Sequence, residues 1–305
     1  MEKVLVIGAD GYIGNRLTEH LILSGKSVIT MVPTNQYDRF SASFPQIPCK
    51  DFDFLTLLDL NYDNFLSNVD TIYQLAWAGV NAQERNNIDV QSQNFFYNIQ
   101  VVKLAQKYNI RRIIMPGSAA EFSCSGNTID GTGASAPSDL YSATKTAVRD
   151  FCTVLCNQLS IELLWPVITS IYGPGRDDNN LISYVIKSLL KGIKPSCTKL
   201  EQKWDYIYIN DLINALYLIG EFGKGGKIYP VGSGEHRPLY EYVNIIHQAI
   251  DPTLPIGVGE IPYKSNTIDN QIIDITNLKK DTGFIPLYTF EKGIKFVIDY
   301  YKTRV

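Results

Sequence analysis

The segment Lys3-Val4-Leu5-Val6-Ile7-Gly8-Ala9-Asp10-Gly11-Tyr12-Ile13-Gly14 decides the fold. Residues 3–7 form an apolar run typical of a buried strand, and a helical pattern over 12–24 follows directly after the glycines. The spacing Gly-x-x-Gly-x-x-Gly suits a tight turn in which bare backbone approaches an anion at a helix N-terminus. The segment therefore predicts a nucleotide-binding turn, with Gly8 and residues 10–14 around the pyrophosphate.

Strand and helix patterns alternate through the first half of the chain. Further strands are predicted over 27–32, 71–76, 112–115 and 161–165, and long helices over 90–108 and 140–159. This alternation predicts an α/β fold with a Rossmann-type, doubly wound parallel sheet. The second half is less regular, with much Pro and Gly. We expect a dinucleotide-binding domain over 1–165, to which residues of about 200–230 return, interleaved with a smaller mixed substrate-binding domain over 166–305.

The composition excludes several classes of protein. The chain has 305 residues, of which 45% are hydrophobic and 19% charged, as in ordinary globular proteins. Lys and Arg number 28 against 31 Asp and Glu, without a basic block, which argues against nucleic acid as a partner. We see neither a signal-peptide pattern nor an apolar stretch that could span a membrane, and the five cysteines lack metal-ligand spacing. We expect a cytoplasmic protein without a metal.

The pair Tyr141 and Lys145 carries the second chemical signal. Four residues apart near the start of a predicted helix, these side chains share one helix face. A tyrosine hydroxyl is a poor base at neutral pH, and a neighbouring ammonium favours the phenolate. Ser118 follows a predicted strand, at the sheet edge where α/β proteins bind ligands. We therefore expect Ser118 to bind a substrate oxygen while Tyr141 exchanges its proton.

In combination these motifs resemble the extended short-chain dehydrogenase/reductase family, in its branch of NAD-dependent epimerases, dehydratases and reductases acting on nucleotide-linked sugars. The resemblance covers nearly the whole chain. The matching segments occur in the family's order: the glycine turn, Leu75-Ala76-Trp77, Asn98, Ser118, Tyr141 with Lys145, Ile171-Tyr172-Gly173-Pro174-Gly175, residues 205–211 and residues 281–286.

The resemblance implies a role for each matched residue. Tyr141 is the general acid/base, Lys145 holds the nicotinamide ribose and lowers the pKa of Tyr141, and Ser118 orients the sugar oxygen. The residues implied at the cofactor are Gly8, Asp10, Gly11, Tyr12, Ile13, Gly14, Leu75, Ala76, Trp77, Asn98, Tyr141 and Lys145. Those implied at the substrate, a nucleotide-diphosphate sugar, are Ser118, Ala119, Glu121, Tyr141, Ser170, Asn180, Leu181, Trp204 and Lys264.

The segment after Ser118 narrows the reaction. Dehydratases of the family carry an Asp-Glu pair there to eliminate water, and this chain has Ala119-Ala120. A 3,5-epimerase-reductase needs a further proton donor and acceptor, for which Cys124 and His236 are the candidates. The stretch over 117–122 looks more like that of deoxysugar 4-reductases. We expect reduction of the 4-keto group of a nucleotide-activated 6-deoxy sugar. The alternative is a nucleotide-sugar 4-epimerase with tightly bound NAD, and the remote one a non-catalytic NAD(P)-sensing regulator.

Departures from the family concern the nucleotide ends of both ligands. Trp204 stands where an Arg commonly grips the diphosphate; it can stack on a base or sugar but supplies no charge. Lys264 stands where another phosphate-binding Arg is usual. The second strand ends in Val32-Pro33-Thr34, without the acid that favours NAD or the Arg that favours NADP. Because this acid is missing, we expect NADP as the cofactor, with NAD as the alternative. By resemblance, the chain forms a homodimer through helices 90–108 and 140–159.

Overall fold

The computed structural model describes residues 1–54, 56–59, 61–81, 83–122, 128–176, 180–263 and 270–304. Its strands are β1 Lys3–Ile7, β2 Ser27–Pro33, β3 Cys49–Phe52, β4 Thr71–Gln74, β5 Arg112–Ile114, β6 Gly117–Ser118, β7 Glu162–Ile168, β8 Ser170–Tyr172, β9 Lys203–Trp204, β10 Tyr206–Tyr208, β11 Ile228–Val231 and β12 Arg237–Pro238. Its α-helices are α1 Tyr12–Leu23, α2 Tyr37–Ser43, α3 Ile88–Lys107, α4 Leu140–Gln158, α5 Leu181–Leu190, α6 Ile209–Phe222, α7 Leu239–Ile250, α8 Thr276–Thr282 and α9 Phe290–Lys302, with short 3₁₀ turns η1 Thr34–Gln36 and η2 Ala119–Phe122.

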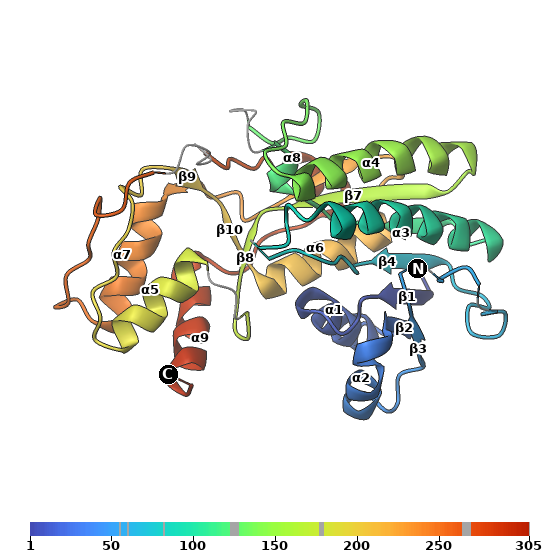
Figure 1. The fold of residues 1–305 in the computed structure, drawn as a ribbon, viewed down its shortest axis with the longest axis horizontal. Helices are drawn as coiled ribbons and strands as arrows, with labels where there is room; N and C mark the ends of the chain where they lie inside the picture. Colours follow the sequence, from blue (N-terminus) through green and yellow to red (C-terminus); the bar gives the residue numbers. More distant parts are fainter. Residues whose placement is uncertain are drawn as a thin grey trace.

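A parallel sheet organises the larger group of elements, and α3, α4, α1 and α6 lie beside it (Figure 1). The strand order is β11-β7-β5-β4-β1-β2-β3, with β6 paired to β7. Its centre is wholly apolar, since Val4–Ile7 of β1 are inaccessible to solvent. The order reverses between β1 and β4, so their carboxyl ends open the crevice where such sheets bind ligands. The predicted doubly wound, Rossmann-type fold is thereby confirmed.

The smaller group of elements consists mainly of α5, α7 and α9, which Figure 1 shows to one side of the sheet. Two short ribbons, the parallel pair β8–β10 and the antiparallel pair β9–β12, connect it to the sheet. Chain segments that follow β8 return to the sheet, because β11 pairs with β7 and α6 packs against α1. The crevice at the sheet edge is therefore bordered by segments from both halves of the chain.

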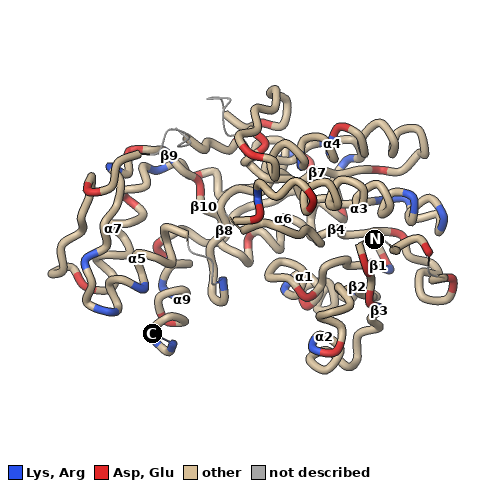
Figure 2. Tube along the Cα trace, viewed as in Figure 1, with Lys and Arg blue, Asp and Glu red and all other residues tan. Residues whose placement is uncertain are grey.

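Charged residues are distributed over both groups of elements. Figure 2 shows Lys and Arg interspersed with Asp and Glu along the coloured trace. Positive charge at the crevice must therefore come from a few individual side chains.

Across the described ranges, no helix is both long enough and apolar enough to cross a membrane.

Candidate active site

A cavity of about 970 Å³ extends along the crevice from the glycine turn to the smaller group of elements. It is bordered by β-strand ends, the first turns of α1 and α4, and the loops after β4 and β8. Predicted site residues on its wall are Gly8, Gly11, Tyr12, Ile13, Gly14, Leu75, Trp77, Ser118, Tyr141, Lys145, Ser170 and Trp204. The structure thus brings the predicted catalytic residues and most of the glycine turn to one cavity.

The glycine turn leaves no room for side chains on its inner side. Gly8 has a φ of +82°, and a Cβ there would meet the Ala76 backbone nitrogen at 2.7 Å. A Cβ on Gly14 would overlap the carbonyl oxygen of Gly8. The first turn of α1 therefore sits tightly on β1, with its N-terminal end at the cavity. This geometry fits a pyrophosphate held by backbone N–H groups.

Tyr141 lies in the first turn of α4, where Asp139 fixes the start of the helix. The Asp139 side chain accepts a hydrogen bond from the Ser142 backbone N–H at 2.8 Å and one from Arg85 Nε at 2.6 Å. The Arg85 guanidinium lies 4.3 Å from the centre of the Tyr141 ring. Burial raises the pKa of the Tyr141 hydroxyl, while hydrogen bonding by Ser118 and the charge of Arg85 oppose that rise.

Lys145 lies one turn further along α4, and its environment differs from the expected one. Its ammonium donates to the Pro116 carbonyl at 2.8 Å and sits 3.6 Å from the centre of the Trp77 ring. The same ammonium is 6.0 Å from the ring centre of Tyr141, so Arg85 is the closer cation. Burial lowers the pKa of Lys145, and the charge of Glu121 opposes this. Arg85 is thus a cation that lowers the pKa of Tyr141, and the same effect expected of Lys145 stays a prediction.

Ser118 is held by the sheet and by a buried carboxylate. β6 pairs with β7, so that Ser118 lies beside Ile168. The Ser118 backbone N–H donates to Glu121 Oε1 at 2.8 Å. Glu121 is fully buried behind the cavity wall, and its other partners are Trp165 and Arg149. The prediction that Glu121 contacts substrate is therefore corrected. Ala119, which was expected at the substrate, is also buried. The neighbouring Ala120 lines the cavity.

The predicted cofactor residues Ala76, Asn98 and Asp10 lie outside the cavity lining. Ala76 packs against Gly8 from behind, and Asn98 is buried with its Oδ1 3.2 Å from Gln74 Nε2. Gln74 itself lines the cavity, so Asn98 supports a residue of its wall. Asp10 is partly exposed at the glycine turn and is not among the lining residues. The direct cofactor contacts expected of the three residues stay predictions.

Where β8 and β9 border the cavity, Trp204 and Ser170 form a hydrogen-bonded pair. Trp204 Nε1 donates to Ser170 Oγ at 2.8 Å, and Gln271 Oε1 lies 2.8 Å from Thr169 Oγ1. All four residues line the cavity. Sequence reasoning missed Gln271, Thr169, Arg85 and Arg176, which also line it. Only Arg176 had a local signal, since it directly follows the matched segment 171–175.

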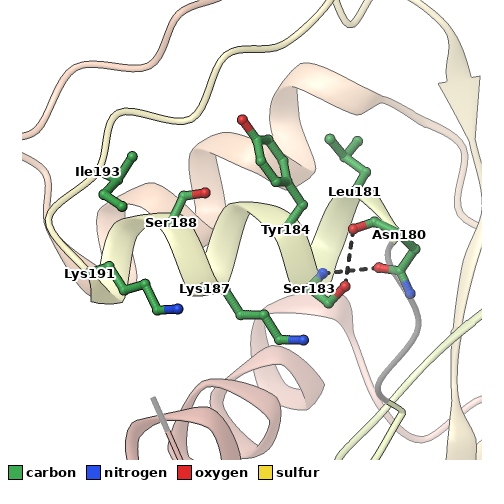
Figure 3. A pocket seen from close by; sticks show the side chains of 8 residues that line it. All are labelled: Asn180, Leu181, Ser183, Tyr184, Lys187, Ser188, Lys191 and Ile193. Atoms are coloured by element: carbon green, nitrogen blue, oxygen red, sulfur yellow. Dashed lines mark hydrogen bonds between the residues drawn. The ribbon is translucent and has the colours of Figure 1, made fainter.

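Asn180 and Leu181 line a different hollow from the one that Tyr141 lines, and their contact with substrate stays a prediction. This hollow of about 420 Å³ runs along α5, and Figure 3 shows it with Lys187 and Lys191. Asn180 begins the helix, because its Oδ1 accepts the Ser183 backbone N–H at 3.0 Å (Figure 3). Its amide is thereby engaged as a helix cap.

Further predicted residues fall outside the cavity or outside the described residues. Lys264 and Cys124 lie outside the described residues. His236 has Nε2 3.0 Å from the Ile273 carbonyl and 3.9 Å from the buried Asp205 carboxylate. Within the ranges the structure covers, no three His, Cys, Asp or Glu side chains gather closely enough to hold a metal ion.

A family model and several curated proteins match the chain. Residues 4–232 match the family model described as "NAD dependent epimerase/dehydratase family". CDP-abequose synthase from Salmonella typhimurium is 27% identical over 304 residues, covering 96% of each chain. A dTDP-glucose 4,6-dehydratase from Xanthomonas campestris is 29% identical over 178 residues, covering 55% of this chain and 51% of that one. The chain thus matches about half the length of this dehydratase.

Solved structures share the fold at low sequence identity. UDP-glucose 4-epimerase from Thermotoga maritima, solved with UDP-glucose, superposes with a TM-score of 0.87 at 17% identity and covers 99% of both chains. UDP-glucose 4-epimerase from Thermus thermophilus, solved with NAD, gives a TM-score of 0.84 at 18% identity, covering 99% of this chain and 100% of that one. At these identities the likeness concerns the fold alone.

Proposed function

The chain belongs to the NAD dependent epimerase/dehydratase family, and from this premise we propose that it reduces the 4-keto group of a nucleotide-activated 6-deoxy sugar. The observation that carries the proposal is the convergence of Ser118, Tyr141 and Lys145 on the cavity that begins at the glycine turn. A dinucleotide at that turn and a sugar beside Ser118 would share one cavity.

The three side chains divide the work of the reduction. NAD(P)H, when bound, supplies the hydride for C4 of the sugar. The Ser118 hydroxyl donates a hydrogen bond to the C4 carbonyl oxygen, and Tyr141 gives that oxygen its phenolic proton as the C–H bond forms. The Lys145 ammonium stabilises the resulting phenolate until solvent returns the proton. The proton that the sugar oxygen gains thus comes from the Tyr141 hydroxyl.

The resting state of Tyr141 suits a proton donor. Because burial raises the pKa of its hydroxyl, the phenol stays protonated at neutral pH. In the opposite direction, the oxidation of a hydroxyl, Tyr141 acts as the phenolate.

The sequence after Ser118 supports a reductase over a dehydratase. Ala119 and Ala120 carry no acid or base, so the second proton-transfer pair required for elimination is missing at those positions. The similarity to CDP-abequose synthase extends over 96% of both chains at 27% identity, and that to a dTDP-glucose 4,6-dehydratase from Neisseria meningitidis over 99% of this chain and 93% of that one at 23% identity. Coverage therefore does not separate the two activities, and the absence of an acid or base at positions 119 and 120 is what favours a reductase.

We propose that two arginines contact the diphosphate, because Trp204 carries no positive charge for this role. Arg176 and Arg85 both line the cavity, and Arg176 Nη1 already donates to the Ile171 carbonyl at 3.0 Å. Guanidinium groups match the geometry of phosphate oxygens. Trp204, held by Ser170, offers a flat indole face for the base or sugar.

For the cofactor we propose NAD(H), and a preference for NADP(H) stays a prediction. The Thermus thermophilus epimerase, which shares the fold, was solved with NAD, and this supports NAD. Of the two cations near the adenosine end, Arg16 is engaged by the Tyr12 and Pro174 carbonyls at 3.1 and 2.7 Å. Arg39 lies close enough to Asp10 to oppose the rise in its pKa that burial causes. Comparing KM for NADH and NADPH decides between the cofactors.

A homodimer through α3 and α4 is also proposed. These helices pack side by side (Figure 1), yet large apolar side chains remain exposed on them. The exposed fractions are 70% for Ile88, 63% for Phe96, 47% for Phe151 and 59% for Val154. Several large apolar side chains exposed on one pair of helices favour an interaction surface there.

A 4-epimerase activity is the second candidate, because this chain shares the fold of two UDP-glucose 4-epimerases. Incubation with NADH or NADPH and a nucleotide-linked 4-keto-6-deoxy sugar separates the two functions. We expect one cofactor molecule to be oxidised for each sugar reduced. Interconversion of UDP-glucose and UDP-galactose without net cofactor oxidation would identify the epimerase. A Tyr141→Phe variant should lose turnover and keep cofactor binding, whereas a non-catalytic sensor would be indifferent to that change.

A further inference from the structure

Glu121 is a buried carboxylate for which the proposed reaction has no direct use. It lies in η2, the short turn after β6, and is fully inaccessible to solvent. Both of its oxygens are engaged. Oε1 accepts the Ser118 backbone N–H at 2.8 Å and the Trp165 indole N–H at 3.2 Å. Oε2 accepts from Arg149 Nη1 at 2.9 Å.

The arrangement joins the two elements that carry the catalytic side chains. Arg149 lies on α4, one turn beyond Lys145 and two turns beyond Tyr141, so the three residues follow one stripe of the helix. Ser118 lies on β6, opposite that stripe. The Glu121 carboxylate therefore bridges from the Ser118 backbone to the helix of Tyr141 and Lys145.

Gly117 shows how closely this bridge fits. A Cβ at position 117 would overlap both the Trp165 indole and the Glu121 carboxylate. The carboxylate thus fills the space directly beneath the backbone of residues 117 and 118. Burial raises the pKa of Glu121, and the hydrogen bond from the Ser118 N–H and the charge of Arg149 oppose that rise, so the carboxylate depends on these partners.

We propose that Glu121 is a positioning residue for Ser118: through the Ser118 N–H on one side and Arg149 on the other, it fixes the distance between the Ser118 hydroxyl and the α4 side chains. This inference rests on the proposed function, because it assigns Ser118 to the reacting oxygen. A displacement of that hydroxyl by a fraction of an ångström weakens a contact made in the transition state.

Asp150 supplies a matched control. It is the other carboxylate that binds Arg149, with Oδ1 2.9 Å from Nη2, but its side chain is largely exposed. Glu121→Gln and Asp150→Asn make the same chemical change beside the same arginine. Only Glu121→Gln alters the group that holds Ser118. Thermal unfolding of each variant checks that both remain folded.

Turnover and a spectroscopic signal are measured together. We expect Glu121→Gln to lower kcat by roughly tenfold to a hundredfold with KM within about twofold, and Asp150→Asn to match the wild type. In ¹⁵N-serine-labelled protein, the Ser118 amide is assigned by its loss in Ser118→Ala. We expect its proton resonance to move upfield in Glu121→Gln alone, since a charged acceptor is replaced by a neutral one.

Each outcome decides the inference. A wild-type kcat in Glu121→Gln overturns it, as does an equal loss of kcat in Asp150→Asn, which would trace the effect to Arg149. If the wild type turns over no nucleotide sugar, the reductase assignment fails and the amide signal decides alone. A Ser118 amide that stays in place in Glu121→Gln then overturns the positioning role, and one that moves supports it.

Discussion

The ammonium of Lys145 lies 3.6 Å from the centre of the Trp77 ring, on the wall of the cavity. A buried ammonium loses its hydration, and burial is the cause that lowers its pKa. The electron-rich face of an indole compensates part of this loss. Trp77 therefore helps to keep Lys145 charged at the place where the phenolate of Tyr141 must be stabilised.

Replacing Trp77 should move the alkaline limb of the pH profile. Lys145 acts as the ammonium, so activity is present below its pKa and is lost as the pH rises through it. In Trp77→Leu the pKa falls further, because the aromatic face is gone. We expect the alkaline limb of kcat to move about one unit toward lower pH. Trp77→Phe keeps an aromatic face and should shift less. Identical limbs in the wild type and Trp77→Leu would contradict this role.

Replacing Arg85 should move a different limb in the opposite direction. In the oxidative direction Tyr141 acts as the phenolate, so kcat/KM rises as the pH passes its pKa. Arg85 opposes the rise in that pKa, and Arg85→Met removes its charge. We expect the limb to move about one unit toward higher pH, whereas Arg85→Lys keeps a cation and shifts less. A limb that stays in place in Arg85→Met would assign Arg85 to binding alone.

The diphosphate contact can be tested at Arg176. Arg176→Met should raise KM for the nucleotide sugar by about tenfold or more and weaken inhibition by the free nucleoside diphosphate equally. Its Kd for NADH should change less, because the glycine turn is proposed to hold the cofactor through backbone N–H groups. Trp204→Phe, which loses the hydrogen bond to Ser170, should raise KM less. A wild-type KM in Arg176→Met would place the diphosphate elsewhere.

The dimer interface is tested by placing a charge on it. We expect the wild type to sediment at twice its chain mass of 34.3 kDa, and Phe96→Asp to sediment at the chain mass. Ile285→Asp is the control, because Ile285 is 65% exposed, similar to the 63% of Phe96, but lies outside α3 and α4. A monomeric wild type, or dissociation of both variants alike, would contradict the proposed interface.

Local patterns predicted the core of the fold well. The predicted bounds of β1 match the structure, and those of α3 and α4 agree within two residues, because apolar periodicity and β-branching report burial directly. The sequence pattern did not predict β11, because Pro230 interrupts it; a proline is tolerated in an edge strand such as β11. It did not predict β3, because Lys50 and Asp51 are polar.

The same distinction holds for the candidate site. Tyr141 and Lys145 could be found because their spacing is local. Arg85 and Gln271 reach the cavity from distant loops, and sequence periodicity does not report such contacts. Glu121 was expected at the substrate because it is charged and close to Ser118 in sequence. Its burial beneath β6 follows from tertiary packing with Trp165 and Arg149.

Transfer of deuterium from the cofactor tests the central claim most directly. The enzyme is incubated with 4-deuterated NADH or NADPH of each stereochemistry and a nucleotide-linked 4-keto-6-deoxy sugar. The product is then analysed by mass spectrometry and NMR. We predict one deuterium at C4 of the sugar, from one cofactor stereoisomer, in equal amount to the cofactor oxidised. A sugar without deuterium, together with interconversion of UDP-glucose and UDP-galactose, would contradict the account.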